Sequence, residues 1–286
     1  MINMKKRFAV LLLFFSAVLL MGYPYLANYV FETASLVNSV EKIEEMTDDT
    51  EKEETKKSVK QYNEKLFSNG VKLCDPFKEE SKKISTEDYR GLLCVNSEGV
   101  MGTISIPAIG VKLPIYHGTS EKILEKWIGH LEGTSLPIGG ENTHTVLTGH
   151  TGLSNAKLFT DLTELEKGEV FFLNILGEQL VYQVDQIQKV LPSNLEELYI
   201  KKGKDYCTLV TCTPYGVNTH RLLVRGTRIQ QGEDFIDSQN IKKKHVESKW
   251  MKEYEKALKY SLIIFGVGLL VLFLWKKNRE KGKGCV

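Results

Sequence analysis

Short apolar and β-branched runs, separated by turn residues, fill the middle of the chain. They cover residues 99–106, 111–116, 145–148, 170–175, 180–190, 206–212 and 220–228. Runs of this length and spacing are typical of a sandwich or barrel rather than of βαβ units. The pattern therefore predicts one mostly β domain over residues 99–232, which is long enough to bury a single core.

An uncharged run also occupies the N-terminal end of the chain. Within residues 1–31, the sequence KKR at 5–7 precedes an uncharged run over 8–31. That run is long enough to cross a hydrocarbon layer of about 30 Å. A cleaved signal peptide shares this design, but the run is longer than a signal core and YPY at 23–25 offers no small-residue cleavage site. We therefore favour an uncleaved membrane anchor, and either interpretation exports the domain that follows.

The C-terminal end repeats this arrangement. Residues 259–275 are apolar and suit a second transmembrane helix, and residues 276–286 form a tail rich in lysine. Basic flanks remain on the cytoplasmic side of a membrane. Both termini are therefore predicted to be cytoplasmic, with the β domain outside the plasma membrane.

Two charged segments flank the β domain. Residues 32–98 form an N-terminal extension, in which the strongly charged stretch 41–60 predicts an exposed helix or a stalk. Residues 233–258 form a second charged spacer before the C-terminal apolar run. The formal net charge is only +2, and neither segment has the character of a nucleic-acid-binding patch.

The five cysteines, Cys74, Cys94, Cys207, Cys212 and Cys285, show no paired spacing that would indicate a disulfide framework. Cys285 lies in the predicted cytoplasmic tail and cannot pair with the others. A bridge between Cys74 and Cys94 stays open. Cys207 lies on the opposite strand face from Cys212 and is predicted to pack in the core.

Candidate chemistry centres on Cys212, at the end of the run 206–212 and just before a turn. Alternation along 220–228 places Arg221 and Arg225 on one strand face. A thiol beside a fixed guanidinium suits a nucleophile with a hydrogen-bond donor for a substrate carbonyl. The competing interpretation is a small buried cysteine that only packs.

A histidine is the natural proton carrier for such a thiol, and the chain has six. His150 stands in the glycine-flanked segment LTGHTG. Its five rivals are in turn-rich stretches, out of step with Arg221, or in the charged spacer: His117, His130, His144, His220 and His245. From the residues alone, none of the six is singled out.

Four sequence features together resemble the sortases, which are cysteine transpeptidases of Gram-positive cell surfaces. They are TLVTC at 208–212, TPYGVNTHR at 213–221, LTGHTG at 147–152 and DPF at 75–77. DPF resembles the lid of class C, the pilus-building subclass. The resemblance implies a closed eight-stranded β-barrel with a helical extension that carries a lid around residues 74–78.

The resemblance also assigns roles. Cys212 would be the nucleophile, His150 the proton carrier and Arg221 the donor to the oxyanion. In the lid, Asp75 would pair with Arg221 and Phe77 would cover the sulfur; the alternative for Asp75-Pro76 is an ordinary turn. We expect this ion pair to be solvent-accessible and to contribute only about 0–1 kcal/mol.

The implied reaction cleaves an LPxTG-like sorting motif between threonine and glycine through a thioacyl-enzyme. The acyl group then passes to a lysine amine of another pilin subunit, which polymerises pili on the cell wall. The alternative is a housekeeping sortase that attaches surface proteins to a peptidoglycan precursor. Neither needs a cofactor, and we expect the enzyme to be a monomer.

Other classes fit the sequence less well. No histidine and cysteine share metal-ligand spacing, so we predict no metal site. A papain-like hydrolase would carry its cysteine before its histidine, whereas His150 precedes Cys212. A surface protein anchored by a sortase would need LPxTG before the C-terminal apolar run, and the nearest sequence, LPIG at 136–139, lies inside the domain.

Overall fold

The computed structural model describes residues 12, 16–17, 22–23, 49–70, 73–78, 87–94, 99–151, 157–230 and 254–268. The chain divides into two units, one of Tyr23–Val246 and one of Met1–Gly22 with Glu247–Val286. The barrel, the N-terminal helix and the candidate site all belong to the first unit.

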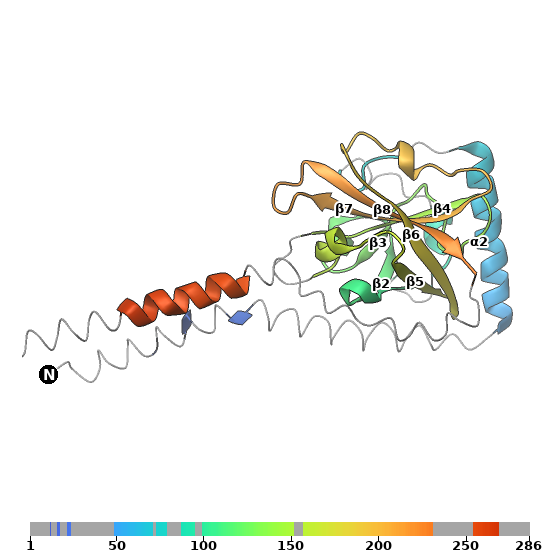
Figure 1. The fold of residues 1–286 in the computed structure, drawn as a ribbon. Helices are drawn as coiled ribbons and strands as arrows, with labels where there is room; N and C mark the ends of the chain where they lie inside the picture. The colour runs from blue at the N-terminus through green and yellow to red at the C-terminus, as the bar shows by residue number, and fades with distance from the viewer. Residues whose placement is uncertain are drawn as a thin grey trace, which may run out of the picture. The chain divides into compact units, whose positions relative to one another are not determined.

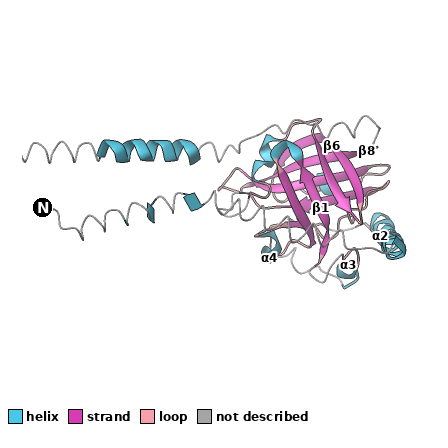
Figure 2. Cartoon of the chain, turned by 90° about the horizontal axis from the view of Figure 1, so that it is seen from below, coloured by secondary structure: helices cyan, strands magenta, loops and turns pink. Residues whose placement is uncertain are grey.

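Eight strands close into a barrel in the order β1-β2-β3-β4-β7-β8-β6-β5 (Figures 1 and 2). The β2–β3 and β4–β7 pairs are parallel and the other pairs are antiparallel. The strands are β1 (Val100–Ile106), β2 (Val111–His117), β3 (Ile128–His130), β4 (Thr143–Thr148), β5 (Val170–Ile175), β6 (Glu178–Val190), β7 (Asp205–Thr213) and β8 (His220–Ile229). The predicted closed eight-stranded barrel is therefore confirmed.

Helical elements decorate this barrel. They are α2 (Asp49–Asn69), α3 (Glu87–Gly91) and α4 (Glu121–Leu124), together with the short 3-10 helices η2 (Pro107–Ile109), η3 (Thr160–Glu164) and η4 (Glu196–Leu198). Figure 1 shows α2 lying along the outside of the barrel. The prediction of a helical extension outside the barrel is confirmed, although the helix runs nine residues beyond the charged stretch 41–60.

Alternation along the strands explains the core. Inward side chains such as Ile104, Leu173, Leu209 and Val224 are fully buried in one large apolar cluster. Cys207 belongs to the same cluster, so its predicted packing role is confirmed.

Helix α2 is fixed to the barrel by one buried asparagine. The Asn63 amide donates to the Leu136 carbonyl over 3.1 Å and accepts from the Leu136 N–H over 2.8 Å. Val59, one turn earlier, is fully buried in the barrel's core cluster. Because the rest of α2 is strongly polar, this narrow stripe is sufficient to dock it while the other faces remain in water.

Most of each predicted membrane segment lies outside the described residues, as do residues 233–253 of the charged spacer. Residues 254–268 form a helix that overlaps the beginning of the predicted segment 259–275. Within the described residues, no helix combines the length and apolar character required to cross a membrane.

Candidate active site

Cys212 and Arg221 face each other across two antiparallel strands. Their register pairs them directly, one residue from the end of β7 and one from the start of β8. Strand alternation then places both side chains on the outer wall of the barrel, because their neighbours Thr211 and Leu222 point the other way. Cys212 is 7% exposed and Arg221 is 8% exposed. The thiol and the guanidinium are thus held on rigid elements, beneath a cover.

His150 is brought to the same end of the barrel by β4. Strand β4 runs parallel to β7 and its last residue, Thr148, pairs with Val210. Beyond the strand, the Gly149 N–H donates to the Val210 carbonyl over 3.1 Å, and Thr211 Oγ1 donates to the Gly149 carbonyl over 2.7 Å. Continuing this register by two residue pairs beyond Thr148 and Val210 sets His150 level with Cys212.

Gly149 explains why glycine precedes this histidine. A Cβ atom at position 149 would lie 2.7 Å from Ile128 Cδ1 and 2.8 Å from Phe159 Cδ2. Real side chains do not approach so closely, so a larger residue would displace the chain that carries His150. The glycine is needed here for close packing rather than for an unusual backbone angle.

The predicted lid contacts two of these three residues, Arg221 and His150. Asp75 accepts two hydrogen bonds from Arg221, one from Nε over 2.9 Å and one from Nη2 over 2.7 Å. The centroid of the Phe77 ring lies 5.3 Å from the centroid of the His150 ring. It lies 4.9 Å from Arg221 Cζ. Asp75 is 4% exposed, so the ion pair is buried. The expectation of a solvent-accessible pair is therefore wrong.

Arg221 has two further partners that the sequence did not indicate. Its Nη1 donates to the carbonyls of Asn218 and His220, over 3.1 and 3.2 Å. Asn218 adopts a positive φ of 60°, which asparagine tolerates better than most residues. The asparagine in the turn before Arg221 was the available signal: it bends the chain so that a carbonyl faces the guanidinium.

In the covered site, both the Cys212 thiol and the His150 imidazole are shifted toward their uncharged forms. Burial raises the pKa of the Cys212 thiol; Arg221 opposes this shift and Asp75 adds to it. Burial lowers the pKa of His150, against the opposing charges of Glu121 and Glu125. The closed arrangement therefore favours a neutral thiol and a neutral imidazole over the reactive ion pair.

An apolar floor continues from the site along the same strand faces. Val210 pairs with Leu223, one step inward from Cys212 and Arg221. Both belong to a small buried cluster separate from the main core, which also contains Leu73, Leu131, Val146 and Leu198, with Phe77, Val190 and Leu195 packed against it. The lid thus rests on an apolar surface that begins beside the thiol.

The rival histidines occupy structural positions. His117 bonds the carbonyls of Gly99 and Leu92. His130 lies in β3 and His144 in β4, not in turns as the sequence indicated, and both are fully buried. His220 has a hydrogen-bonding contact with Thr219, and His245 lies outside the described residues. Of the histidines that the structure describes, His150 is thus the one whose ring contacts the lid.

Comparison with known proteins agrees with this geometry. A family model described as a sortase domain matches residues 104–229. The crystal structure of sortase C1 from Streptococcus agalactiae is 46% identical, with a TM-score of 0.62, and the match covers 70% of this chain and all of that one. Sortase C-1 from Actinomyces oris is 44% identical, with a TM-score of 0.59, over 63% of this chain and 99% of that one.

More distant relatives bear the same family name. Sortase A of Bacillus anthracis is 27% identical over 216 residues, which cover 76% of this chain and 90% of the relative. The fold and the sequence similarity together show that the chain belongs to the sortase family of cysteine transpeptidases. Within the family it is a class C enzyme, because its relatives of known structure at about 45% identity are sortases C.

Proposed function

We propose that this chain is a membrane-anchored class C sortase that polymerises pilin subunits, with Cys212, His150 and Arg221 as its catalytic residues. The main support is the convergence of these three side chains at one end of a closed barrel, under a lid that contacts two of them. The solved structures at 44–46% identity are sortases C, and one is titled for its insights into pilin substrate specificity.

In the first half-reaction, His150 takes the proton of the Cys212 thiol, and the sulfur attacks the carbonyl carbon of threonine in an LPxTG-like motif. A thioester forms as the bond to the glycine nitrogen breaks, and His150 delivers a proton to that leaving amine. Arg221 cannot act as a base because its guanidinium stays protonated. It donates hydrogen bonds to the developing oxyanion, a role that typically contributes about 10²–10³ in rate.

In the second half-reaction, a lysine amine of the next pilin subunit attacks the thioester carbonyl. An isopeptide bond forms, the amine loses a proton to His150, and the Cys212 thiolate is released. No group is oxidised or reduced, so the cycle needs no redox cofactor. Arg221 must first exchange Asp75 for the substrate, which makes lid opening an obligatory step.

The envelope location follows from the same proposal. Sortases act at the Gram-positive cell envelope, and the apolar ends of the sequence would anchor this one, with residues 1–31 and 259–275 crossing the plasma membrane. The catalytic barrel would then face outward, where pilin subunits emerge. Both termini would remain in the cytoplasm, in accord with their basic flanks.

Incubation of the full-length protein with an LPxTG peptide should produce a covalent adduct on Cys212. Mass spectrometry after rapid quenching should find the mass of the peptide up to threonine on the peptide fragment that contains Cys212. The Cys207→Ala variant is the matched control and should form the same adduct, since Cys207 is buried in the barrel core. An active protein without acylation at Cys212 would refute the proposal.

The housekeeping alternative makes a different prediction in cells. Deletion of the gene should remove the ladder of high-mass pilin polymers on denaturing gels if the enzyme is a pilus polymerase. Loss of wall-attached monomeric surface proteins with an intact ladder would instead favour the housekeeping function. The higher identity to sortases C, 44–46% against 27–30% for relatives named sortase A or D, favours the polymerase.

A further inference from the structure

Arg225 and His144 lie on the same strand faces as the candidate site but take no part in it. Along β7 and β8, three successive pairs share the outer face: Cys212 with Arg221, Val210 with Leu223, and Thr208 with Arg225. The third pair is four residues from the first, about 13 Å at the usual rise of a strand. This distance is too great for contact with the reacting atoms, so any role of Arg225 must act through other residues.

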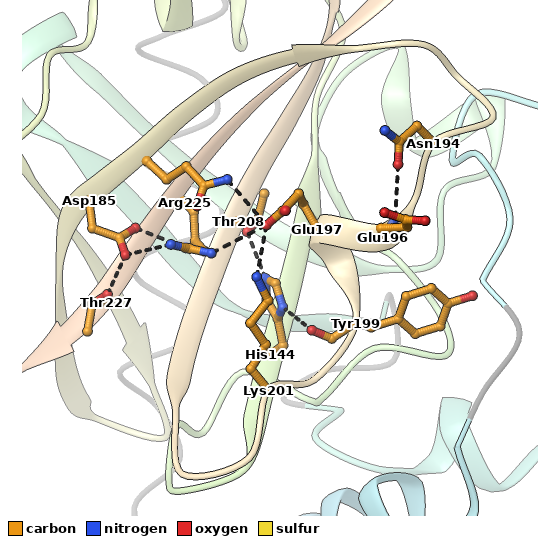
Figure 3. A network of polar contacts seen from close by, with 11 residues as sticks. His144, Asp185, Asn194, Glu196, Glu197, Tyr199, Lys201, Thr208, Arg225 and Thr227 are labelled. Atoms are coloured by element: carbon orange, nitrogen blue, oxygen red, sulfur yellow. Dashed lines mark hydrogen bonds and ion pairs between the residues drawn. The ribbon is translucent and has the colours of Figure 1, made fainter.

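Figure 3 shows the guanidinium of Arg225 between Asp185 of β6 and Glu197 of the loop that follows β6. Asp185 accepts two hydrogen bonds, from Nε over 3.0 Å and from Nη2 over 2.8 Å. Glu197 Oε2 lies 3.5 Å from Nη1. The Tyr206 ring lies 4.3 Å from Arg225 Cζ, which adds a cation–π contact on one face of the guanidinium. Arg225 is thus held firmly by the barrel and extends one contact outward to the loop.

The same loop, residues 191–204, has a second attachment at His144. The carbonyl of Tyr199 lies 3.0 Å from His144 Nδ1, and Thr208 Oγ1 lies 2.7 Å from Nε2 (Figure 3). Because a carbonyl can only accept, Nδ1 carries a proton. Burial lowers the pKa of His144 to about 4, so the imidazole is neutral at pH 7 and Thr208 then donates to Nε2.

Glu197 also accepts hydrogen bonds from Gln186 over 3.2 Å and from Lys201 over 3.0 Å. Two leucines of the loop lie near these attachments, Leu198 between them and Leu195 two residues before Glu197. Leu195 and Leu198 pack against Val210 and Leu223, on the floor that extends to Cys212. The contacts Arg225–Glu197 and His144–Tyr199 thus hold Leu195 and Leu198 beside the apolar floor on which the closed lid rests.

We propose that Arg225 and His144 are positioning residues, which hold the loop 191–204 as a wall of the peptide-binding surface and so govern KM rather than the chemical step. The proposal rests on the sortase function above, because the ligand of this surface is the extended sorting peptide. When the lid leaves, its place against Leu195 and Leu198 becomes available to an apolar side chain of that peptide. A loosened wall would weaken binding of the peptide but leave Cys212, His150 and Arg221 in place.

Glu197→Gln tests the Arg225 attachment with little risk to the fold. It removes the charge that faces Arg225 but keeps the Arg225–Asp185 pair within the barrel. Glu196→Gln is the matched control, because Glu196 is the exposed neighbour in the same 3-10 helix. For the full-length protein and an LPxTG peptide, Glu197→Gln should raise KM about two- to fivefold and change kcat less than about twofold. Glu196→Gln should change neither.

Arg225→Lys and His144→Gln test the two barrel residues themselves. Each should also raise KM, and Arg225→Lys combined with Glu197→Gln should raise it no more than the stronger single variant, since both break one contact. A fall in kcat at unchanged KM would overturn the proposal. If His144→Gln does not fold, the coupling between Arg225 and Glu197 decides.

Hydrogen exchange of the loop provides a readout that does not depend on activity. Backbone amides in 191–204 should exchange faster in Glu197→Gln than in wild type and Glu196→Gln, with the strands unchanged. An unchanged loop would overturn the proposal even if KM rose. Failure of the wild type to acylate Cys212 would refute the function instead, while loop exchange would still report on the attachment.

Discussion

Replacement of Asp75 by alanine should accelerate alkylation of Cys212 by a thiol reagent about tenfold to a hundredfold. Asp75 holds Arg221 through two hydrogen bonds and is 4% exposed. Breaking a buried ion pair by removal of one partner costs about 3–5 kcal/mol where the remaining charge stays buried. Arg221 regains water when the lid opens, so alanine at position 75 should shift the lid equilibrium strongly toward the open form.

The same replacement should also change the thiol itself. Burial and Asp75 both raise the pKa of Cys212, while Arg221 lowers it. An open lid removes the first two effects and leaves the third, so the pKa of Cys212 should fall. The pH profile of alkylation should therefore move to lower pH in Asp75→Ala, and by more than uncovering of the sulfur alone would produce, because the charge of Asp75 is lost as well.

Two further variants define the mechanism of the lid. Phe77→Ala removes the ring that contacts His150 and Arg221 but keeps the ion pair, so it should accelerate alkylation by a smaller factor. Lys78→Ala, at an exposed residue of the same segment, should leave the rate within about twofold of wild type. Equal rates in wild type, Asp75→Ala and Phe77→Ala would mean that DPF forms only a turn.

The barrel shows how far periodicity alone predicts this fold. Seven of the eight strands coincide with apolar runs in the sequence, because each is at least six residues long and carries several buried side chains. The eighth, β3, has only three residues, too few to display a period. Only the resemblance to the sortases implied an eighth strand. Strand β3 pairs parallel to β2, and the short helix α4 lies in the connection between them.

The sequence predicted only part of the candidate site. Strand alternation correctly placed Arg221 and Arg225 on one face, but alternation cannot tell which of them faces Cys212. That depends on register, which the turn at 214–219 sets and the family spacing supplied. The burial of the Asp75–Arg221 pair was not predictable either, because the two residues are 146 positions apart and their exposure depends on how the lid lies.

The rival histidine and arginine show most directly what the local sequence cannot predict. His144 and Arg225 are distinguished from His150 and Arg221 by their neighbours and not by their local sequence. His144 is enclosed within the polar network of Figure 3, with a carbonyl and a hydroxyl at its two nitrogens, whereas His150 meets the lid. Long-range neighbours of this kind become visible only after the sheet has closed.

The last prediction concerns acid: stability of the barrel should fall steeply between about pH 6 and pH 4.5. Burial lowers the pKa of His130 to about 3 and that of His144 to about 4. Unfolded histidine has a pKa of about 6.5, so above that pH both states are neutral and the full stability is present. Below it, the unfolded chain binds protons that the folded protein rejects.

Each of the two histidines then costs about 1.4 kcal/mol of unfolding free energy per pH unit, together about 3 kcal/mol. Asp205, whose pKa burial raises, binds its proton earlier in the folded state and offsets part of this loss. Because domains are stable by only about 5–15 kcal/mol, a fall of 1.5 pH units should remove a large share of the total.

Urea denaturation of the full-length protein at pH 7, 6, 5 and 4.5 measures this slope. The variant His144→Gln should be less stable at pH 7 but lose stability with pH at a visibly smaller slope, because one of the two buried imidazoles is gone. His220→Gln is the control and should retain the wild-type slope, since its ring lies at the barrel surface beside Thr219. A wild-type slope in His144→Gln would contradict the prediction, because it would show that protonation of His144 has no part in the acid sensitivity of the barrel.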